Sequence, residues 1–163
     1  MKHILSALVL NKPGVLAHVA GMFAARAFNI DSLAVGRTDD PTLSRMTIVV
    51  VGDDKVVEQV RKQLVKIVSI VKVQDYVGQD VVARDLMLIS VSCPPEKRPE
   101  MMALIEMFNG KVVEIGQKFV MVEITGPENK IESFIDACRP YGIKSMVRTG
   151  TVAMPRQART PQT

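Results

Sequence analysis

The sequence predicts an α+β protein made of two units that share one βαββαβ order of strands and helices. Short stretches with alternating or continuous apolar residues and longer stretches with apolar residues at helical spacing follow one another in the same order twice. Pro, Gly, Asn and Asp separate these stretches, as expected for turns. With 47% hydrophobic residues among 163, the chain has enough apolar material for a packed core in each half.

A local pattern predicts each of the first six elements. The opening strand is a near-continuous apolar run, as in a central strand, whereas the third strand alternates, with Met46, Ile48 and Val50 on one face. Asp53 is a suitable N-cap for the second helix. The elements are, in order, a strand over 3–10, a helix over 15–27, strands over 30–37 and 43–51, a helix after Asp53 and a strand over 70–77.

The second half repeats this order. Pro94 and Pro95 end its first strand, Pro99 suits the first turn of a helix, and Asn109 with Gly110 suits that helix's end. The elements are a strand over 86–91, a helix from Pro99 to Phe108, strands over 111–115 and 119–125, a helix from Pro127 and a strand over 143–149. Two such βαββαβ runs predict two ferredoxin-like domains.

The predicted domain boundaries follow from these elements. We expect a first domain over residues 1–77, a polar link over 78–84 and a second domain over 85–152. Residues 153–163 show no apolar periodicity, which predicts a mobile tail.

Composition narrows the functional classes. The net charge is +4 and the pI is near 9.2, but Lys and Arg are scattered, which favours a solvated surface over a nucleic-acid interface. The strands over 3–10 and 43–51 lack the aromatic residues on which RNA-binding versions of this fold stack bases. No apolar run is long enough to span a bilayer, and the first residues resemble a strand, so we expect a cytoplasmic protein. Cys93 and Cys138 lack metal-ligand spacing and are predicted to be buried, inert thiols.

A candidate anion site lies where the first strand leads into the first helix. Asn11 and Gly14 precede the helix, and Gly14 lets a ligand approach the backbone closely. The free N–H groups of the next turn, at Val15 and Leu16, point at any negative group there and are aided by the helix dipole. An amino-acid carboxylate would fit. A Pro-Gly turn before a helix also has a purely structural use, so the motif alone leaves both roles open.

The polar stretch over 37–42 admits more than one interpretation. Asp39 and Asp40 are a conceivable metal pair, but adjacent aspartates before Pro41 are typical of a hairpin turn, which is favoured. A charged loop of this kind is also a candidate contact for a partner protein, with Asp39 and Arg45 as its polar contacts.

Beyond these patterns, the chain resembles a known family over nearly its whole length. The stretches HILSALVLNKPGVLAHVAGMFAARAFNIDSL and AVGRTDDPTLSRMTIVVVGDD are similar to the N-terminal ACT domain of the small, regulatory subunit of acetohydroxyacid synthase, also called acetolactate synthase. The stretches FNGKVVEI and PYGIKSMVRTG resemble the C-terminal domain of the same family.

The resemblance implies a non-catalytic subunit. Such a subunit forms homodimers, activates a thiamine-diphosphate-dependent catalytic subunit and confers feedback inhibition by a branched-chain amino acid, most often valine. Thiamine diphosphate, magnesium and flavin belong to the catalytic partner in that family. We therefore expect no catalytic residue, metal or cofactor in this chain, which has no phosphate-binding loop and no nucleophile beside a base. The alternatives are a stand-alone ACT-type amino-acid sensor that acts on another enzyme or on transcription, and a small nucleic-acid-binding protein.

The resemblance also implies a binding site for the effector at the interface of two ACT domains. One subunit contributes the first loop, here Asn11, Gly14, Val15 and Leu16, and the other contributes the start of the second strand, here Asn29 and Ile30. Asn11 also suits a turn, Asn29 also suits a cap after the helix and Ile30 also suits ordinary core, so these structural roles stay open beside the ligand role. The second domain has Pro94-Pro95-Glu96-Lys97 before its first helix, and we expect no equivalent site there.

Overall fold

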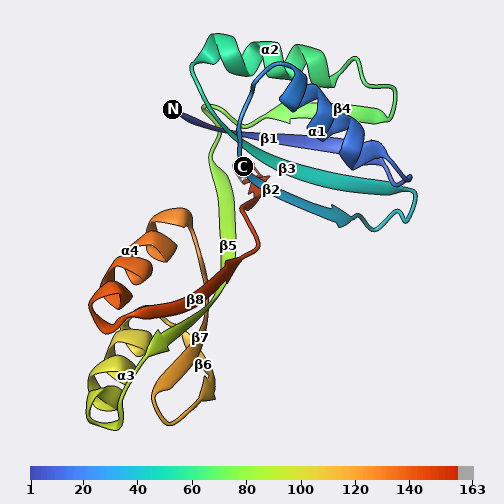
Figure 1. Cartoon of the computed structure of the whole chain (residues 1–163). Helices are drawn as coiled ribbons and strands as arrows, with labels where there is room; N and C mark the ends of the chain where they lie inside the picture. The colour runs from blue at the N-terminus through green and yellow to red at the C-terminus, as the bar shows by residue number, and fades with distance from the viewer. Residues whose placement is uncertain (158–163) are drawn as a thin grey trace, which may run out of the picture. The chain divides into compact units, whose positions relative to one another are not determined.

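The computed structural model describes residues 1–157 and contains two compact units (Figure 1). The first unit comprises Met1–Val82 together with the C-terminal segment from Thr151, and the second comprises Ala83–Gly150. Each unit contains two α-helices and four antiparallel strands in the βαββαβ order, and the sheet of the second unit includes a fifth strand. The predicted fold class is therefore confirmed.

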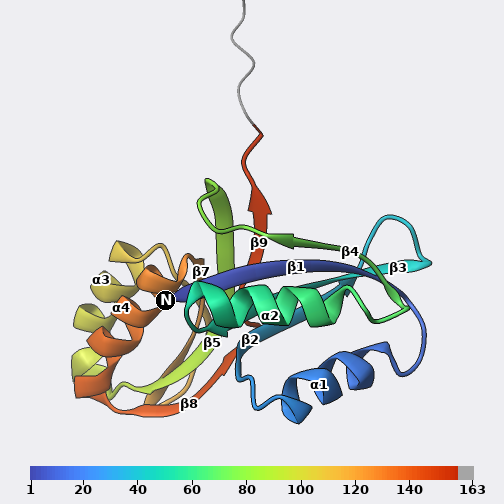
Figure 2. The same cartoon turned by 90° about the horizontal axis from the view of Figure 1, so that it is seen from above.

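In the first unit, two helices cover one face of a sheet with the strand order β2-β3-β1-β4 (Figures 1 and 2). The most apolar strands, β1 and β3, lie in the centre, where Leu5 faces Ile48 and both are fully buried. The elements are β1 (Lys2–Leu10), α1 (Val15–Ala25), β2 (Ile30–Arg37), β3 (Leu43–Val51), α2 (Asp54–Leu64) and β4 (Ile70–Asp75). Helix residues Val19, Phe23, Val60 and Leu64 complete the core.

The second unit repeats this arrangement with the strand order β6-β7-β5-β8. Its core contains Met87, Ile89, Val122 and Phe134, and the rings of Phe108 and Phe134 meet edge-on at 5.3 Å between centroids. The elements are β5 (Val81–Ser92), the 3₁₀ turn η1 (Pro95–Lys97), α3 (Arg98–Met107), β6 (Lys111–Ile115), β7 (Phe119–Gly126), α4 (Glu128–Cys138), the 3₁₀ turn η2 (Arg139–Tyr141) and β8 (Ile143–Arg148).

The first helix of each unit ends in the same way. After α1, Ala27 adopts a left-handed conformation with φ 55°, and the Phe28 N–H donates to the Phe23 carbonyl at 3.0 Å. After α3, Asn109 has φ 53°, and the Gly110 N–H donates to the Ile105 carbonyl at 2.8 Å. This is the Schellman arrangement, which satisfies the last carbonyls of a helix. In α1, an edge-on contact between Phe23 and Phe28 adds the apolar contact that commonly accompanies it.

Two boundary expectations are wrong. β5 begins at Val81, inside the expected link over 78–84, so more than half of that link is strand. Val152–Pro155 form a further strand, β9, which pairs with β5, so the expected mobile tail does not begin at 153. Its Ala153 is buried, and the Arg156 N–H donates to the Asp80 carbonyl at 2.8 Å. A four-residue strand is too short to show a period, and its partner lies some 70 residues earlier. The remainder of the expected tail, 158–163, lies outside the described residues.

Candidate functional site

The β1–α1 junction has the backbone geometry of an anion site. Gly14 adopts φ 84°, a left-handed conformation that favours glycine, and α1 starts at the next residue. In the described part of the chain, no side chain caps the first turn of α1 and no acidic residue lies within it. The N–H groups at Val15 and Leu16 therefore have neither a capping side chain nor an acidic residue of their own turn as a partner.

The other three α-helices of residues 1–157 differ from α1. Each carries an acidic residue in its first turn, namely Asp54 in α2, Glu100 in α3 and Glu128 in α4. α2 is also capped, because Asp53 Oδ1 accepts the Val56 N–H at 2.9 Å. An acidic group near a helix N-terminus interacts favourably with the helix dipole. The first turn of α1 contains no such group.

Asn11 has a structural role in the loop. Its backbone N–H donates to the Thr42 carbonyl at 2.7 Å, and its side-chain Nδ2 donates to the Pro41 carbonyl at 3.0 Å. These two bonds join the β1–α1 loop to the β2–β3 loop. The turn-forming role that the sequence left open is thus present. It does not conflict with a ligand role, because an amide has separate donor and acceptor atoms and only the donor, Nδ2, is used in this bond.

Asn29 and Ile30 stand at the start of β2. Ala27 and Phe28 close the C-terminus of α1, so the structure removes the alternative that Asn29 is there to cap this turn. Asn29 is exposed. Ile30 is half-buried and packs against the first core, so its core role is present as well.

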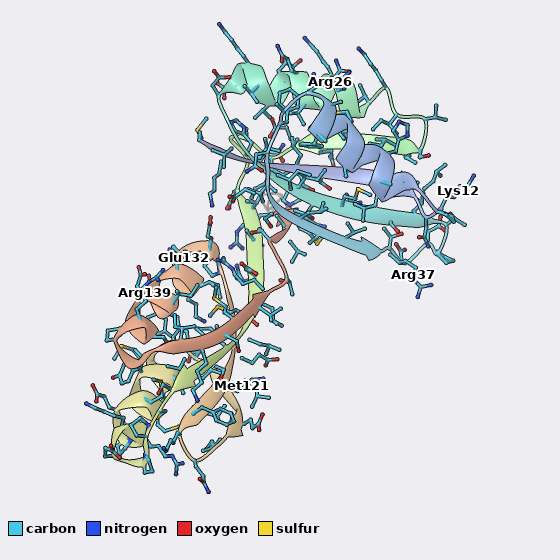
Figure 3. The ribbon with its side chains drawn as sticks, viewed as in Figure 1. Lys12, Arg26, Arg37, Met121, Glu132 and Arg139 are labelled. Atoms are coloured by element: carbon cyan, nitrogen blue, oxygen red, sulfur yellow. The ribbon has the colours of Figure 1, made fainter. Side chains whose placement is uncertain are left out.

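Within one chain, the two sets of predicted residues lie at opposite ends of α1. Gly14 precedes the helix and Asn29 follows it, and Lys12 and Arg26 mark the two ends in Figure 3. An 11-residue helix is about 16 Å long at 1.5 Å per residue, well beyond the span of a branched-chain amino acid. One chain therefore does not bring the two sets together around one small ligand.

The β2–β3 loop is organised by its own side chains. Asp40 Oδ1 accepts the Thr42 N–H at 2.9 Å and the Thr42 hydroxyl at 2.7 Å, and these bonds lower the pKa of the Asp40 carboxyl. This is the predicted turn chemistry. Asp39 is exposed, whereas the Arg45 guanidinium donates to Ser6 Oγ at 2.8 Å on the neighbouring strand. A role for Asp39 and Arg45 in partner contact stays a prediction.

Two hollows of the first unit lie away from the predicted effector residues. One, of about 550 Å³, lies between α1 and α2 and is lined by His18, Arg26 and Lys66 among others. The other, of about 440 Å³, lies at the start of α2 and includes the buried His3, whose Nε2 is 3.6 Å from Asp54 Oδ1.

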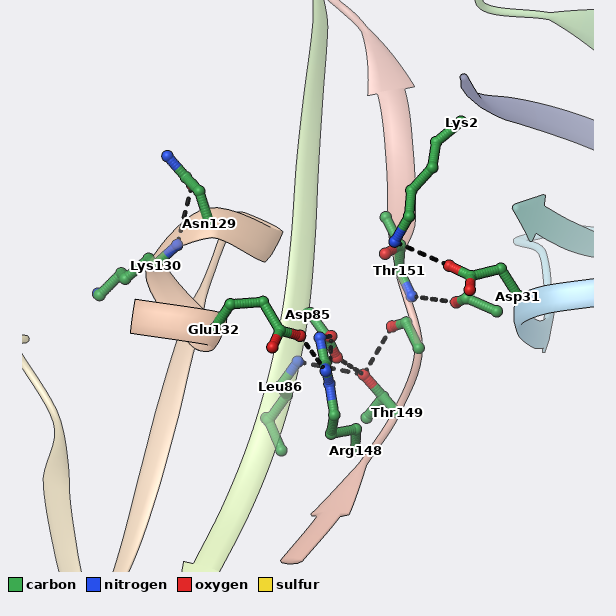
Figure 4. A network of polar contacts seen from close by, with 12 residues as sticks. Lys2, Asp31, Asp85, Leu86, Asn129, Lys130, Glu132, Arg148, Thr149 and Thr151 are labelled. Carbon is green, nitrogen blue, oxygen red and sulfur yellow. Dashed lines mark hydrogen bonds and ion pairs between the residues drawn. The ribbon is translucent and has the colours of Figure 1, made fainter. Parts of the chain in front are cut away.

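The second unit uses its charged groups internally. The buried Asp85 accepts two hydrogen bonds from Arg148, at 2.9 and 2.7 Å, and Arg148 also donates to Glu132 at 2.6 Å (Figure 4). Burial alone would lower the Arg148 pKa, but the bonds to Glu132 and Asp85 outweigh it and raise that pKa. Arg148 therefore stays charged within a closed ionic cluster.

The chemistry of the remaining groups is modest. Cys93 and Cys138 are both buried and free, as predicted, and burial raises the pKa of Cys138 to about 11. Such a thiol is inert at neutral pH. Across residues 1–157, no group of three or more His, Cys, Asp or Glu side chains is placed to bind a metal ion. Among the helices of the same residues, none has the length and apolar character needed to cross a membrane.

Sequence reasoning missed one contact beside the predicted site. The register of β2 against β3 shifts between Ile30 and Ser32, which marks a bulge, and Ser32 Oγ accepts the Thr151 N–H at 2.8 Å. The two residues are 119 positions apart, and no local pattern joins them.

Comparison with known proteins gives one consistent result. A family model described as "AHAS small subunit-like ACT domain" matches residues 5–72, and one described as "Small subunit of acetolactate synthase" matches residues 84–157. Together the two matches span nearly the whole described chain.

Individual relatives agree with these matches. A "Probable acetolactate synthase small subunit" of Archaeoglobus fulgidus is 53% identical over 96% of this chain and 98% of that protein. The acetolactate synthase small subunit of Bacillus subtilis is 43% identical over 96% of this chain and 91% of its own length. The crystal structure of the small subunit from Thermotoga maritima superposes with a TM-score of 0.88 at 42% identity, covering 96% of this chain and 98% of that one.

Proposed function

Because the chain belongs to the family of acetolactate synthase small subunits, which are regulatory and not catalytic, we propose that it activates a catalytic subunit and makes it sensitive to a branched-chain amino acid. Valine is the effector that we expect. On this proposal, the chemistry and its cofactors, thiamine diphosphate, magnesium and flavin, stay on the catalytic subunit. This chain contributes binding surfaces only, and it acts in the cytoplasm.

The observation that supports an effector at the β1–α1 junction is the first turn of α1. Its N–H groups follow a left-handed Gly14, and in the described chain neither a capping side chain nor a first-turn acid competes for them. A carboxylate placed there would complete the helix end as Asp53 and Asp54 complete that of α2. Asn11 Oδ1 is then available as an acceptor for the ammonium group of the amino acid.

The position of Asn29 and Ile30 supports a site shared by two copies of the chain. They lie the length of α1 from Gly14, so one ligand contacts both sets only if each is supplied by a different chain. β2 is an edge strand of its sheet, with Val35 about half exposed, and an edge strand of this kind can pair with a second copy. The start of β2 in one copy would then cover the α1 terminus of the other.

The test is the rate of acetolactate formation by the cognate catalytic subunit, with and without this chain, across a valine titration. We expect the chain to raise the rate and valine to reverse the increase, with leucine and isoleucine as comparison effectors. No change of rate at any ratio of the two proteins would contradict the proposal and favour a stand-alone amino-acid sensor.

A further inference from the structure

The start of β2, where the proposed effector site lies, is an irregular segment held from two sides. Ile30 faces Val50 and Ser32 faces Val49, so Asp31 is the extra residue of a β-bulge in an edge strand. Bulges bend a strand and change the direction of the neighbouring side chains, and they often lie beside functional sites. Here the neighbours are Asn29 and Ile30.

Two contacts hold this bulge. Asp31 forms an ion pair with Lys2 at 2.9 Å, but both side chains are more than a third exposed, so the pair contributes little. Ser32 Oγ, by contrast, accepts the half-buried Thr151 N–H at 2.8 Å. Figure 4 shows both contacts beside each other. The bond of Ser32 therefore fixes the bulge more firmly.

Thr151 opens the C-terminal segment that belongs to the first unit. This segment continues into β9 (Val152–Pro155), whose Ala153 is 5% exposed. At its far end, the Arg156 N–H donates to the Asp80 carbonyl at 2.8 Å, and the Arg156 guanidinium lies 3.3 Å from the Asp80 carboxylate. The segment is thus bound to the first unit at both ends, and one of these ends is Ser32.

We propose that Ser32 is a positioning residue for the effector site, and that its bond to the Thr151 amide couples effector binding to the docking of the C-terminal strand. The inference rests on the proposed function, since it concerns the same site. When the strand is docked, Ser32 holds the bulge, and the bulge holds Asn29 and Ile30 in the orientation that contacts the effector. Because coupling between two equilibria is reciprocal, the bound effector must stabilise the docked strand to the same degree.

The test uses the full chain with valine as the probe. Ser32→Ala removes the acceptor, Ser32→Thr retains it and suits a strand, and Ser145→Ala removes an exposed serine of β8 as the control. One net hydrogen bond corresponds to about a 2- to 10-fold change in affinity. We expect Ser32→Ala to raise the Kd for valine by this factor, Ser32→Thr to restore it, and the control to leave it unchanged.

The second readout is hydrogen exchange at the Thr151 amide, which a merely structural serine would not link to valine. We expect saturating valine to slow this exchange about 2- to 10-fold in the unaltered chain and in Ser32→Thr, but not in Ser32→Ala. Equal valine affinity in Ser32→Ala and the unaltered chain, or Thr151 exchange that ignores valine, would overturn the inference. If the unaltered chain binds none of valine, leucine and isoleucine, the proposed effector function itself fails, and the inference fails with it.

Discussion

The two units share one topology, and their first helices end alike but begin differently. α1 and α3 both close with a left-handed residue, Ala27 and Asn109, and the same pair of backbone bonds. At its start, α1 presents free N–H groups after a left-handed Gly14. α3 instead follows a 3₁₀ turn in which the N–H groups of Lys97 and Arg98 donate to the carbonyls of Pro94 and Pro95.

The difference is consistent with the effector site that we propose for the first unit and with a structural role for the same junction in the second. In the second unit, Pro99 has no N–H to offer, Glu100 supplies the first-turn acid, and Arg98 donates its Nη2 to the Gly116 carbonyl at 2.8 Å. Most polar groups of that junction are therefore bonded within the unit itself, whereas Arg98 Nε is buried without a partner. In the first unit, the first turn of α1 has no such partners, and we propose that the carboxylate of the effector takes their place.

The largest effect is expected from placing an acid at the start of α1. Gly14→Asp adds a carboxylate where that of the effector must lie, and we expect valine binding to weaken by about 3 kcal/mol, or roughly 100-fold, through like-charge repulsion. Calorimetric titration with valine measures the loss. Activation of the catalytic subunit should remain.

The matched control at this position is Gly14→Asn. Asn and Asp both tolerate the left-handed conformation better than other side chains, so the two variants share their backbone strain and differ in charge. No atom outside the adjacent residues lies within 4 Å of a Cβ built on Gly14, so neither side chain is crowded at its base. Equal loss of valine binding in both variants would mean that strain, and not charge, is responsible.

The next prediction examines the junction of the second unit. Arg98→Met keeps the apolar stem but removes the bonds to the turn at Gly116, and we expect the free energy of unfolding to fall by about 2 kcal/mol, as for other charged hydrogen bonds. Chemical denaturation measures it. Lys97→Met, whose exposed side chain pairs only at 3.4 Å with Glu100, should change stability by less than about 0.5 kcal/mol. A change of valine affinity in Arg98→Met would show that this junction does take part in effector binding.

Sequence patterns predicted several element boundaries because the determinants are local, although the helix expected over 15–27 ends at Ala25. Asn109 and Gly110 indicate the end of α3, Asp53 indicates the start of α2, and the apolar runs of β1 and β3 identify the central strands. Capping and burial depend on residues within a few positions of each other, so the sequence carries them directly.

The parts that escaped prediction depend on contacts between distant residues. β9 is recognisable only from its pairing with β5, and the bond from Thr151 to Ser32 spans 119 positions. The site residues are a different case: the predicted helix over 15–27 already separates Asn29 and Ile30 from Gly14 within one chain, and only the resemblance joined the two sets, through a second subunit. Their role in binding stays a prediction.

A smaller effect tests whether the start of β2 contacts the effector's side chain. Ile30→Val removes one methylene from a half-buried residue, and we expect valine affinity to fall by about 0.8 kcal/mol, or roughly 4-fold. Ile70→Val in β4 is the matched control, because Ile70 packs against the same core from the other edge of the sheet. Both variants should lose similar stability, and a 4-fold loss of affinity in both would mean that the core, not the contact, sets the affinity.

No effect on valine affinity is expected at α2, the helix of the first unit that supplies its own cap. Asp53→Ala leaves the Val56 N–H without its acceptor, and we expect the free energy of unfolding to fall by about 1 kcal/mol, while Asp53→Asn retains most of the bond. Thermal unfolding monitored by circular dichroism measures both. Valine affinity should not change in either variant, because α2 needs no ligand to complete its first turn. Because the proposed effector site lies at α1 and not at α2, we expect valine to raise the unfolding temperature of the Asp53→Ala chain by as much as it raises that of the unaltered chain. A smaller increase would place α2 within the effector site.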